Sequence, residues 1–188
     1  SLGGSAFYDC NAAASIDCGS LTVIPERAFY NAKAVKTVKL SDNVTSIGER
    51  AFYNCMVLET INWPSQLKTI GKQAFYYARK LQNLDFSGTQ LESIGSSAFY
   101  QPYEARTLAF PGTLQSIDSK AFAYLNYNKT AYITEVGIPA SVTSLAKDAF
   151  YLASGLKNIV VDANNPVYAS SNGIVMLKDT GEIYIWPQ

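Results

Sequence analysis

The 188-residue sequence contains no histidine. Histidine is the usual general base of enzymes and the commonest metal ligand, so its absence removes the first choice for both roles. Charged residues make up only 16% of the chain, and its 15 basic and 15 acidic side chains cancel. A balanced charge offers neither the basic surface that binds nucleic acid nor a polybasic membrane patch. We therefore expect no nucleic-acid partner.

Long apolar runs are also missing. No apolar stretch approaches the ~20 residues that a membrane-spanning helix needs, so we expect no membrane insertion of this chain. Apolar residues nevertheless make up 48% of the sequence, and aromatic residues make up 13%. This composition excludes global disorder and is sufficient to build a buried core.

One short motif recurs along the whole sequence. An Ala-Phe pair, followed by tyrosine in six of seven copies, returns every 22 to 28 residues. A period of this length is typical of solenoid arrays, in which each unit packs on its neighbours. The seven Ala-Phe boxes are Ala6-Phe7-Tyr8, Ala28-Phe29-Tyr30, Ala51-Phe52-Tyr53, Ala74-Phe75-Tyr76, Ala98-Phe99-Tyr100, Ala121-Phe122-Ala123 and Ala149-Phe150-Tyr151.

Each repeat also contains a strand pattern. Apolar residues return seven, ten and twelve positions after the alanine, and the residues between them alternate, as in Lys36-Thr37-Val38-Lys39-Leu40. This is the period of a half-buried strand, so we predict one strand per repeat. Segments such as 44–47 can form a second short extended stretch, whereas the Ala-Phe boxes suit a helical turn. Such units must stack strand beside strand at ~4.8 Å, with the phenylalanines aligned in one spine.

The repeats resemble the BspA-like, or Treponema pallidum type, leucine-rich repeats of bacterial surface proteins. Family repeats read roughly Ile-Gly-x-x-Ala-Phe-x-x-Cys-x-x-Leu-x-x-Ile-x-Ile-Pro, and residues 47–64 match this pattern nearly throughout. The resemblance implies an α/β repeat solenoid, namely a right-handed β-α superhelix with one strand ladder and a C-terminal hairpin cap. It also implies a role in adhesion or protein recognition at the bacterial surface.

Two parts are expected along the chain. Residues 1–161 are predicted to form a leucine-rich repeat array of seven repeats, which starts in mid-repeat because Leu2-Gly3 already matches the Ile-Gly position. Residues 162–188 are predicted to form a C-terminal capping segment. Two apolar runs flank Asp179-Thr180-Gly181 there and predict a β-hairpin that closes the apolar end of the array.

The tyrosine that follows most boxes allows two interpretations. It can form a packing ladder between repeats at the margin of the convex side, or it can form a strip that binds sugar or protein. The sixth repeat adds about five residues within 124–132, including Tyr124, Tyr127 and Tyr132. This insertion is either a lengthened connection on the convex side or a loop that contacts a ligand.

The three cysteines follow the repeat pattern. Cys10 and Cys55 stand in a column of small residues, and Cys18 stands in a strand column, so all three are predicted to be buried. No disulfide framework or zinc spacing exists, although a bridge between Cys10 and Cys18 stays open. A catalytic thiol would need a base, and the usual one is missing.

The outward positions of the strands form the main candidate binding surface. They are small, polar and nearly neutral, and they would make a concave face that suits a broad partner. Three tyrosines of the insertion are added to this surface. The candidate residues are Thr37, Lys39, Thr60, Asn62, Asn83, Asp85, Thr107, Glu135, Asn158, Tyr124, Tyr127 and Tyr132.

No constellation in the sequence indicates catalysis. Paired carboxylates, phosphate-binding glycine loops and nucleophile motifs are missing, and turn chemistry explains 162–165 and 179–182 better than calcium binding does. We predict no enzyme activity, no cofactor and no metal. The favoured hypothesis is a secreted or cell-surface bacterial module that binds an extracellular or host protein. The alternatives are a carbohydrate-binding module that uses surface tyrosines, and a structural spacer for an upstream domain.

Overall fold

The structure is a computed structural model that describes residues 9, 12–127 and 132–185. Within these residues the chain forms strands and turns but no helix. The fold is therefore a repeat solenoid of parallel strands, and the expected β-α superhelix is wrong in its helical part. The first Ala-Phe box and Cys10 lie outside the described residues.

Left-handed backbone positions explain why the Ala-Phe boxes are turns and not helices. Arg27 and Asn31, which flank the box at Ala28, have φ angles of 53° and 62°. Arg50 and Asn54 repeat this geometry in the next unit, with φ angles of 53° and 60°. A right-handed helix requires consecutive residues with negative φ, so two left-handed residues four positions apart prevent one.

Backbone hydrogen bonds join successive boxes directly. The Phe29 N–H donates to the Ala51 carbonyl at 2.7 Å, and the Asn31 N–H donates to the Tyr53 carbonyl at 2.7 Å. Every second N–H of the box thus bonds to the next repeat, while those between them close turns within their own repeat, as Tyr30 does with Arg27. The boxes therefore satisfy buried backbone groups without a helix.

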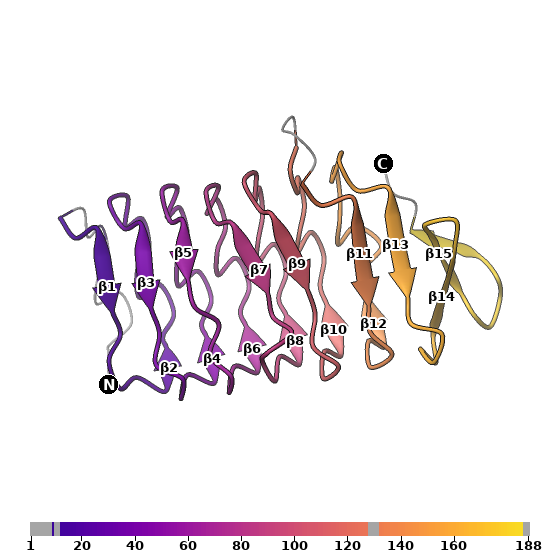
Figure 1. The fold of residues 1–188 in the computed structure, drawn as a ribbon, viewed down its shortest axis with the longest axis horizontal. Coiled ribbons are helices and arrows are strands. Elements are labelled where there is room, and N and C mark those ends of the chain that lie inside the picture. Colours follow the sequence, from indigo (N-terminus) through magenta and orange to yellow (C-terminus); the bar gives the residue numbers. More distant parts are fainter. Residues whose placement is uncertain (1–8, 10–11, 128–131, 186–188) are drawn as a thin grey trace.

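The first strand ladder runs along the whole array (Figure 1). Its strands pair in parallel within three groups, β1-β3-β5, β7-β9 and β11-β13. In each strand the outward side chains alternate with inward ones, as the sequence predicts. The strands are β1 (Ser15–Asp17), β3 (Thr37–Lys39), β5 (Thr60–Ile61), β7 (Asn83–Asp85), β9 (Thr107–Ala109), β11 (Glu135–Ile138) and β13 (Asn158–Val161).

A second ladder corrects the expectation of a single one. It is a continuous six-stranded parallel sheet in which each strand contributes one buried Ile or Leu and one outward residue. These pairs are too short to show alternation in the sequence, which is why only an extended stretch is predicted there. The strands are β2 (Val23–Ile24), β4 (Ser46–Ile47), β6 (Thr69–Ile70), β8 (Ser93–Ile94), β10 (Ser116–Ile117) and β12 (Ser144–Leu145).

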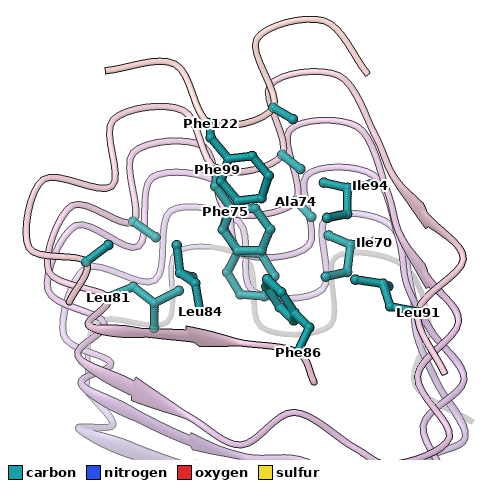
Figure 2. Packing of buried hydrophobic residues seen from close by; sticks show 14 of the residues in the cluster. Ile70, Ala74, Phe75, Leu81, Leu84, Phe86, Leu91, Ile94, Phe99 and Phe122 are labelled. Atoms are coloured by element: carbon teal, nitrogen blue, oxygen red, sulfur yellow. The ribbon is translucent and has the colours of Figure 1, made fainter. Parts of the chain in front are cut away.

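A column of stacked phenylalanines fills the space between the two ladders. The ring centroids of successive repeats are 4.9–5.6 Å apart and the rings are tilted by at most 13°. In Figure 2 the rings stand between Leu84 of the first ladder and Ile70 and Ile94 of the second. The predicted alignment of the boxes is confirmed. The phenylalanine column consists of Phe29, Phe52, Phe75, Phe99, Phe122 and Phe150.

An antiparallel sheet ends the described array. It consists of β14 (Tyr168–Ser171), β15 (Ile174–Leu177) and β16 (Ile183–Ile185), and β15 and β16 flank Asp179-Thr180-Gly181. The Ile159 N–H of β13 donates to the Gly173 carbonyl at 3.1 Å, and the Val161 N–H donates to Ser170 Oγ at 2.8 Å. This sheet therefore covers the edge of the last parallel strand.

Close contact between repeats requires glycine after several strands of the second ladder. A Cβ on Gly71 would lie 2.8 Å from the backbone nitrogen of Glu49, so we expect Gly71→Ala to cost about 1–3 kcal/mol. Asp118 and Ala146 occupy this column at later junctions, which shows that coils can shift to admit a side chain. Chemical unfolding should compare this variant with Gly88→Ala, where a Cβ meets no atom within 4 Å. Equal stability of the two variants would contradict this account of the junction.

Candidate functional site

The predicted strand positions lie together on one exposed face of the first ladder. Neighbouring repeats join their side chains along this face: Thr60 Oγ1 donates to Thr37 Oγ1 at 3.1 Å. Thr107 Oγ1 likewise donates to Asn83 Oδ1 at 2.8 Å. The structure thus brings the nine strand residues of the candidate surface onto the exposed sheet face: Thr37, Lys39, Thr60, Asn62, Asn83, Asp85, Thr107, Glu135 and Asn158.

Polar side chains at the amino-terminal half of this face form ion pairs and hydrogen bonds with neighbouring repeats. Lys39 Nζ lies 3.1 Å from Asp17 Oδ2, and both side chains are largely exposed. Asn62 donates to the Leu40 carbonyl at 3.0 Å and accepts from the Leu40 N–H at 2.7 Å, so its amide bonds to the backbone of the preceding repeat. A hollow of about 720 Å³ lies over these residues, and its lining includes the paired Asp17 and Lys39 as well as Asp42.

The carboxyl-terminal half of the face carries Asp85 in a different environment. Asp85 Oδ1 accepts a hydrogen bond from the Ser87 N–H at 3.0 Å. The hydroxyl and the N–H of Ser87 hold the pKa of the Asp85 carboxyl below its ordinary value, so this carboxylate stays ionised at neutral pH. Glu135 accepts from Asn158 Nδ2 at 3.4 Å. Within the described part of the chain neither carboxylate forms a salt bridge.

Two adjoining hollows occupy this half of the face. We call the first the polar hollow; it measures about 390 Å³. We call the second the apolar hollow; it measures about 400 Å³ and shares Leu108 and Ala109 with the first. The polar hollow is lined by Asp85, Arg106, Thr107, Leu108, Ala109, Tyr132, Ile133, Thr134 and Glu135. The apolar hollow is lined by Leu108, Ala109, Phe110, Gly137, Ile138, Pro139, Val160 and Asp162.

Small residues create the depression. Ala109 and Gly137 stand at the outward strand position that Lys39, Asn62 and Asp85 fill in earlier repeats. A Cβ on Gly137 would meet no atom within 4 Å, which confirms that the space above it is open. The hollows therefore result from missing side-chain volume on an otherwise regular sheet.

The insertion places its three tyrosines on two different surfaces. Tyr132 is 44% exposed and lines the polar hollow, where the Arg106 guanidinium carbon lies 5.4 Å from its ring centroid. Tyr124 contacts the rings of Tyr100 and Tyr127, both at 5.2 Å and edge to face. Only Tyr132 therefore belongs with the strand residues of the candidate surface.

A buried asparagine anchors the insertion, and no pattern in the sequence distinguishes it from the other asparagines. Asn126 is 1% exposed, and its Nδ2 donates to the carbonyls of Tyr103 at 3.1 Å and Ala105 at 2.8 Å. Its Oδ1 accepts from the Ile133 N–H at 3.3 Å. Asn126 thereby ties the insertion to the preceding repeat and fixes the position from which Tyr132 projects.

The tyrosines that follow the boxes form a second ordered surface, the tyrosine row: Tyr30, Tyr53, Tyr76 and Tyr100. Their centroids are 4.5–5.0 Å apart and their planes agree within 6°. The packing-ladder interpretation is confirmed, because each ring covers the face of the next. Burial raises the pKa of Tyr100 to about 12. The ring faces between neighbouring members of the row are therefore covered by each other.

The described cysteines are inert. Cys18 and Cys55 are buried and free, which confirms their predicted burial. Cys55 Sγ lies 3.2 Å from the Phe29 carbonyl oxygen, to which its thiol donates. Burial raises the pKa of Cys18 to about 11 and that of Cys55 to about 12, so neither forms a reactive thiolate near neutral pH.

Candidate metal ligands do not gather in the described ranges. No group of three or more cysteine, aspartate or glutamate side chains is arranged to hold an ion there. Asp162 Oδ1 accepts from the Asn164 N–H at 2.8 Å, as a turn-forming aspartate does. The same ranges contain no helix with the length and apolar character needed to cross a membrane.

The repeat geometry agrees with one sequence family. The model of the BspA type leucine-rich repeat region matches residues 1–129 and 125–171, with six copies. The chain belongs to the BspA-type leucine-rich repeat family. No curated protein sequence matches it.

Several solved structures of bacterial proteins have a similar fold. The pneumococcal vaccine antigen PcpA is 22% identical, with a TM-score of 0.75 over 96% of this chain and 48% of that one. A leucine-rich cell surface protein from Faecalibacterium prausnitzii is 27% identical, with a TM-score of 0.63 over 93% and 55%. The T. pallidum leucine-rich repeat protein is 24% identical, with a TM-score of 0.68 over 78% and 69%. The chain thus spans about half the length of the first two.

Proposed function

We propose that this domain is a non-catalytic recognition module of a secreted or cell-surface bacterial protein, and that it binds an extracellular or host protein. The exposed sheet face is the proposed contact surface. Stacked repeats provide a long, rigid and regularly spaced set of side chains, which suits a broad macromolecular partner better than a small substrate. The F. prausnitzii protein of the same fold, described as a cell surface protein, supports the proposed location.

The observation that carries this proposal is that each strand buries one set of side chains in the core and exposes the other set to solvent. Inward residues such as Val38 and Leu84 are at most 2% exposed and belong to the core. Outward residues form the exposed sheet face and contribute little to the core, so they are accessible to a partner. Tyrosine packing weakens the carbohydrate alternative, because ring faces in the tyrosine row are covered.

A blocking substitution tests the contact surface. Gly137→Arg places a long side chain at the apolar hollow, which Gly137 lines, without a steric conflict at Cβ, and we expect it to reduce binding at least tenfold. Binding of the domain to immobilised extracellular matrix proteins and mucin provides the measurement. The matched control is Ser144→Arg, which adds the same side chain to an exposed position of the second ladder.

The outcomes separate cleanly when both variants keep the melting temperature of the parent. Loss of binding in Gly137→Arg alone supports the exposed sheet face as the contact. Equal loss in both variants, or loss in Ser144→Arg alone, contradicts it. Absence of binding to every protein and mucin tested would contradict the recognition role itself.

A further inference from the structure

We propose that the polar and apolar hollows together bind an extended segment of the partner protein that carries a lysine or arginine close to a large apolar residue. This inference rests on the proposed function and names the chemistry of the partner. It follows from three properties of the hollows: unpaired negative charge, an apolar wall, and a floor of small residues.

Charge defines the first subsite. Asp85 and Glu135 both line the polar hollow, and neither has a salt-bridge partner in the ranges 12–127 and 132–185. Asp17 occupies the same face and is paired with Lys39 at 3.1 Å. Arg106, the cation at this hollow, lies against the ring of Tyr132 and does not pair with either carboxylate. A cationic side chain from a partner would therefore complement this hollow.

Exposed apolar surface defines the second subsite. Val160 is 46% exposed, because it stands at the outward position of β13 between the buried Ile159 and Val161. Phe110 and Pro139 line the same apolar hollow. An apolar side chain of the partner would remove these groups from water, and this burial of apolar surface lowers the free energy of binding. The exposed Asp162 adds one carboxylate to the lining of this otherwise largely apolar subsite.

The floor favours an extended backbone over a compact ligand. Ala109 lines both hollows and Gly137 lines the apolar one, so the sheet surface is low there, and a glycine within a strand often marks the close approach of another backbone. In an extended chain, residues i and i+2 point to the same side and lie about 6.5–7 Å apart. An extended segment that crosses both hollows can therefore present a cationic side chain to the polar hollow and an apolar side chain to the apolar hollow.

Short peptides provide the direct test. The probe is a fluorescent heptapeptide Gly-Ser-Arg-Thr-Leu-Ser-Gly, and two controls replace its arginine by glutamate or its leucine by serine. Fluorescence anisotropy measures binding to the whole domain at 50 and 200 mM salt. We expect the probe to bind at least tenfold more tightly than either control, and its affinity to fall as salt increases.

Paired variants locate the contact. The double substitution Asp85→Asn with Glu135→Gln should weaken probe binding about tenfold and remove most of its salt dependence. Asp17→Asn changes a carboxylate of the same face that Lys39 already neutralises, so binding should not change. All three positions are exposed, and unchanged melting temperatures verify folding. Equal effects of the double variant and Asp17→Asn would overturn the proposal, as would equal binding of the probe and its glutamate control.

The two proposals fail in different ways. If Gly137→Arg abolishes binding to a matrix protein while the double carboxylate variant does not, the exposed sheet face is the contact and the basic-apolar segment is wrong. If neither variant affects binding to that protein, both proposals are wrong. If both variants abolish it and the probe competes, both proposals are supported.

Discussion

Replacing Phe75 by alanine is expected to cost about 3–5 kcal/mol of unfolding free energy. Phe75 is 1% exposed, and its ring lies 5.0 Å from that of Phe52 and 5.1 Å from that of Phe99. Trp63 adds an edge contact at 5.5 Å. The substitution leaves a cavity at the centre of the phenylalanine column, where neighbouring rings on both sides limit collapse. Urea unfolding, followed by circular dichroism, measures the loss.

The matched control for this prediction lies on the exposed face of the first ladder. Thr60→Ala removes an exposed hydroxyl whose bond to Thr37 is accessible to water, so its effect should stay within about 0.5 kcal/mol. Similar losses at Phe75 and Thr60 would mean that the assigned inward and outward sides of the array are wrong.

Replacing Asn165 by alanine is expected to cost about 2–4 kcal/mol, because it leaves several buried backbone groups without partners. Asn165 is fully buried, and its Nδ2 donates to the carbonyls of Pro139 at 3.0 Å and Val142 at 2.8 Å. Its Oδ1 accepts from the N–H groups of Val167 at 2.9 Å and Tyr168 at 2.8 Å. The side chain thus joins the last loops of the array to the start of β14.

The neighbouring asparagine provides the control. Asn164→Ala changes an exposed side chain in the same turn and should be nearly neutral. Hydrogen exchange adds a local readout, since the loss of Asn165 should expose the amides of β14 and β15 before those of β3. Equal melting temperatures of the Asn164 and Asn165 variants would show that the amide network does not support the terminal sheet.

The residues of the buried core could be predicted from the sequence. The phenylalanine column and the inward strand residues follow from apolar periodicity alone, because a stacked repeat must bury the same positions in every unit. The backbone conformation of the Ala-Phe boxes could not be predicted in the same way. Asn31 and Asn54 suit the left-handed positions of the boxes, but Tyr77 and Leu152 adopt similar φ angles of 65° and 54° without any such preference. The repeat geometry imposes these angles, so the turns could not be distinguished from a helical turn by sequence.

The candidate site was predictable only in part. Alternation places Asp85 and Glu135 on the exposed sheet face, and the structure confirms that placement. The hollows, however, depend on the absence of side chains at Ala109 and Gly137 and on the position of Tyr132 beside them. These residues meet only after the insertion has folded against the preceding repeat through Asn126, and single-sequence patterns contain no signal for that contact.

The direction of the hydrogen bonds between repeats has a mechanical consequence. Bonds such as Phe29 N–H to Ala51 lie along the stacking direction, so a pulling force along this direction loads each junction in tension and separates one unit at a time. Each 23-residue unit released in this way would lengthen a stretched tether by about 75 Å. An array of this kind, held between a cell and a moving partner, would yield in steps and relieve load before its remaining units detach.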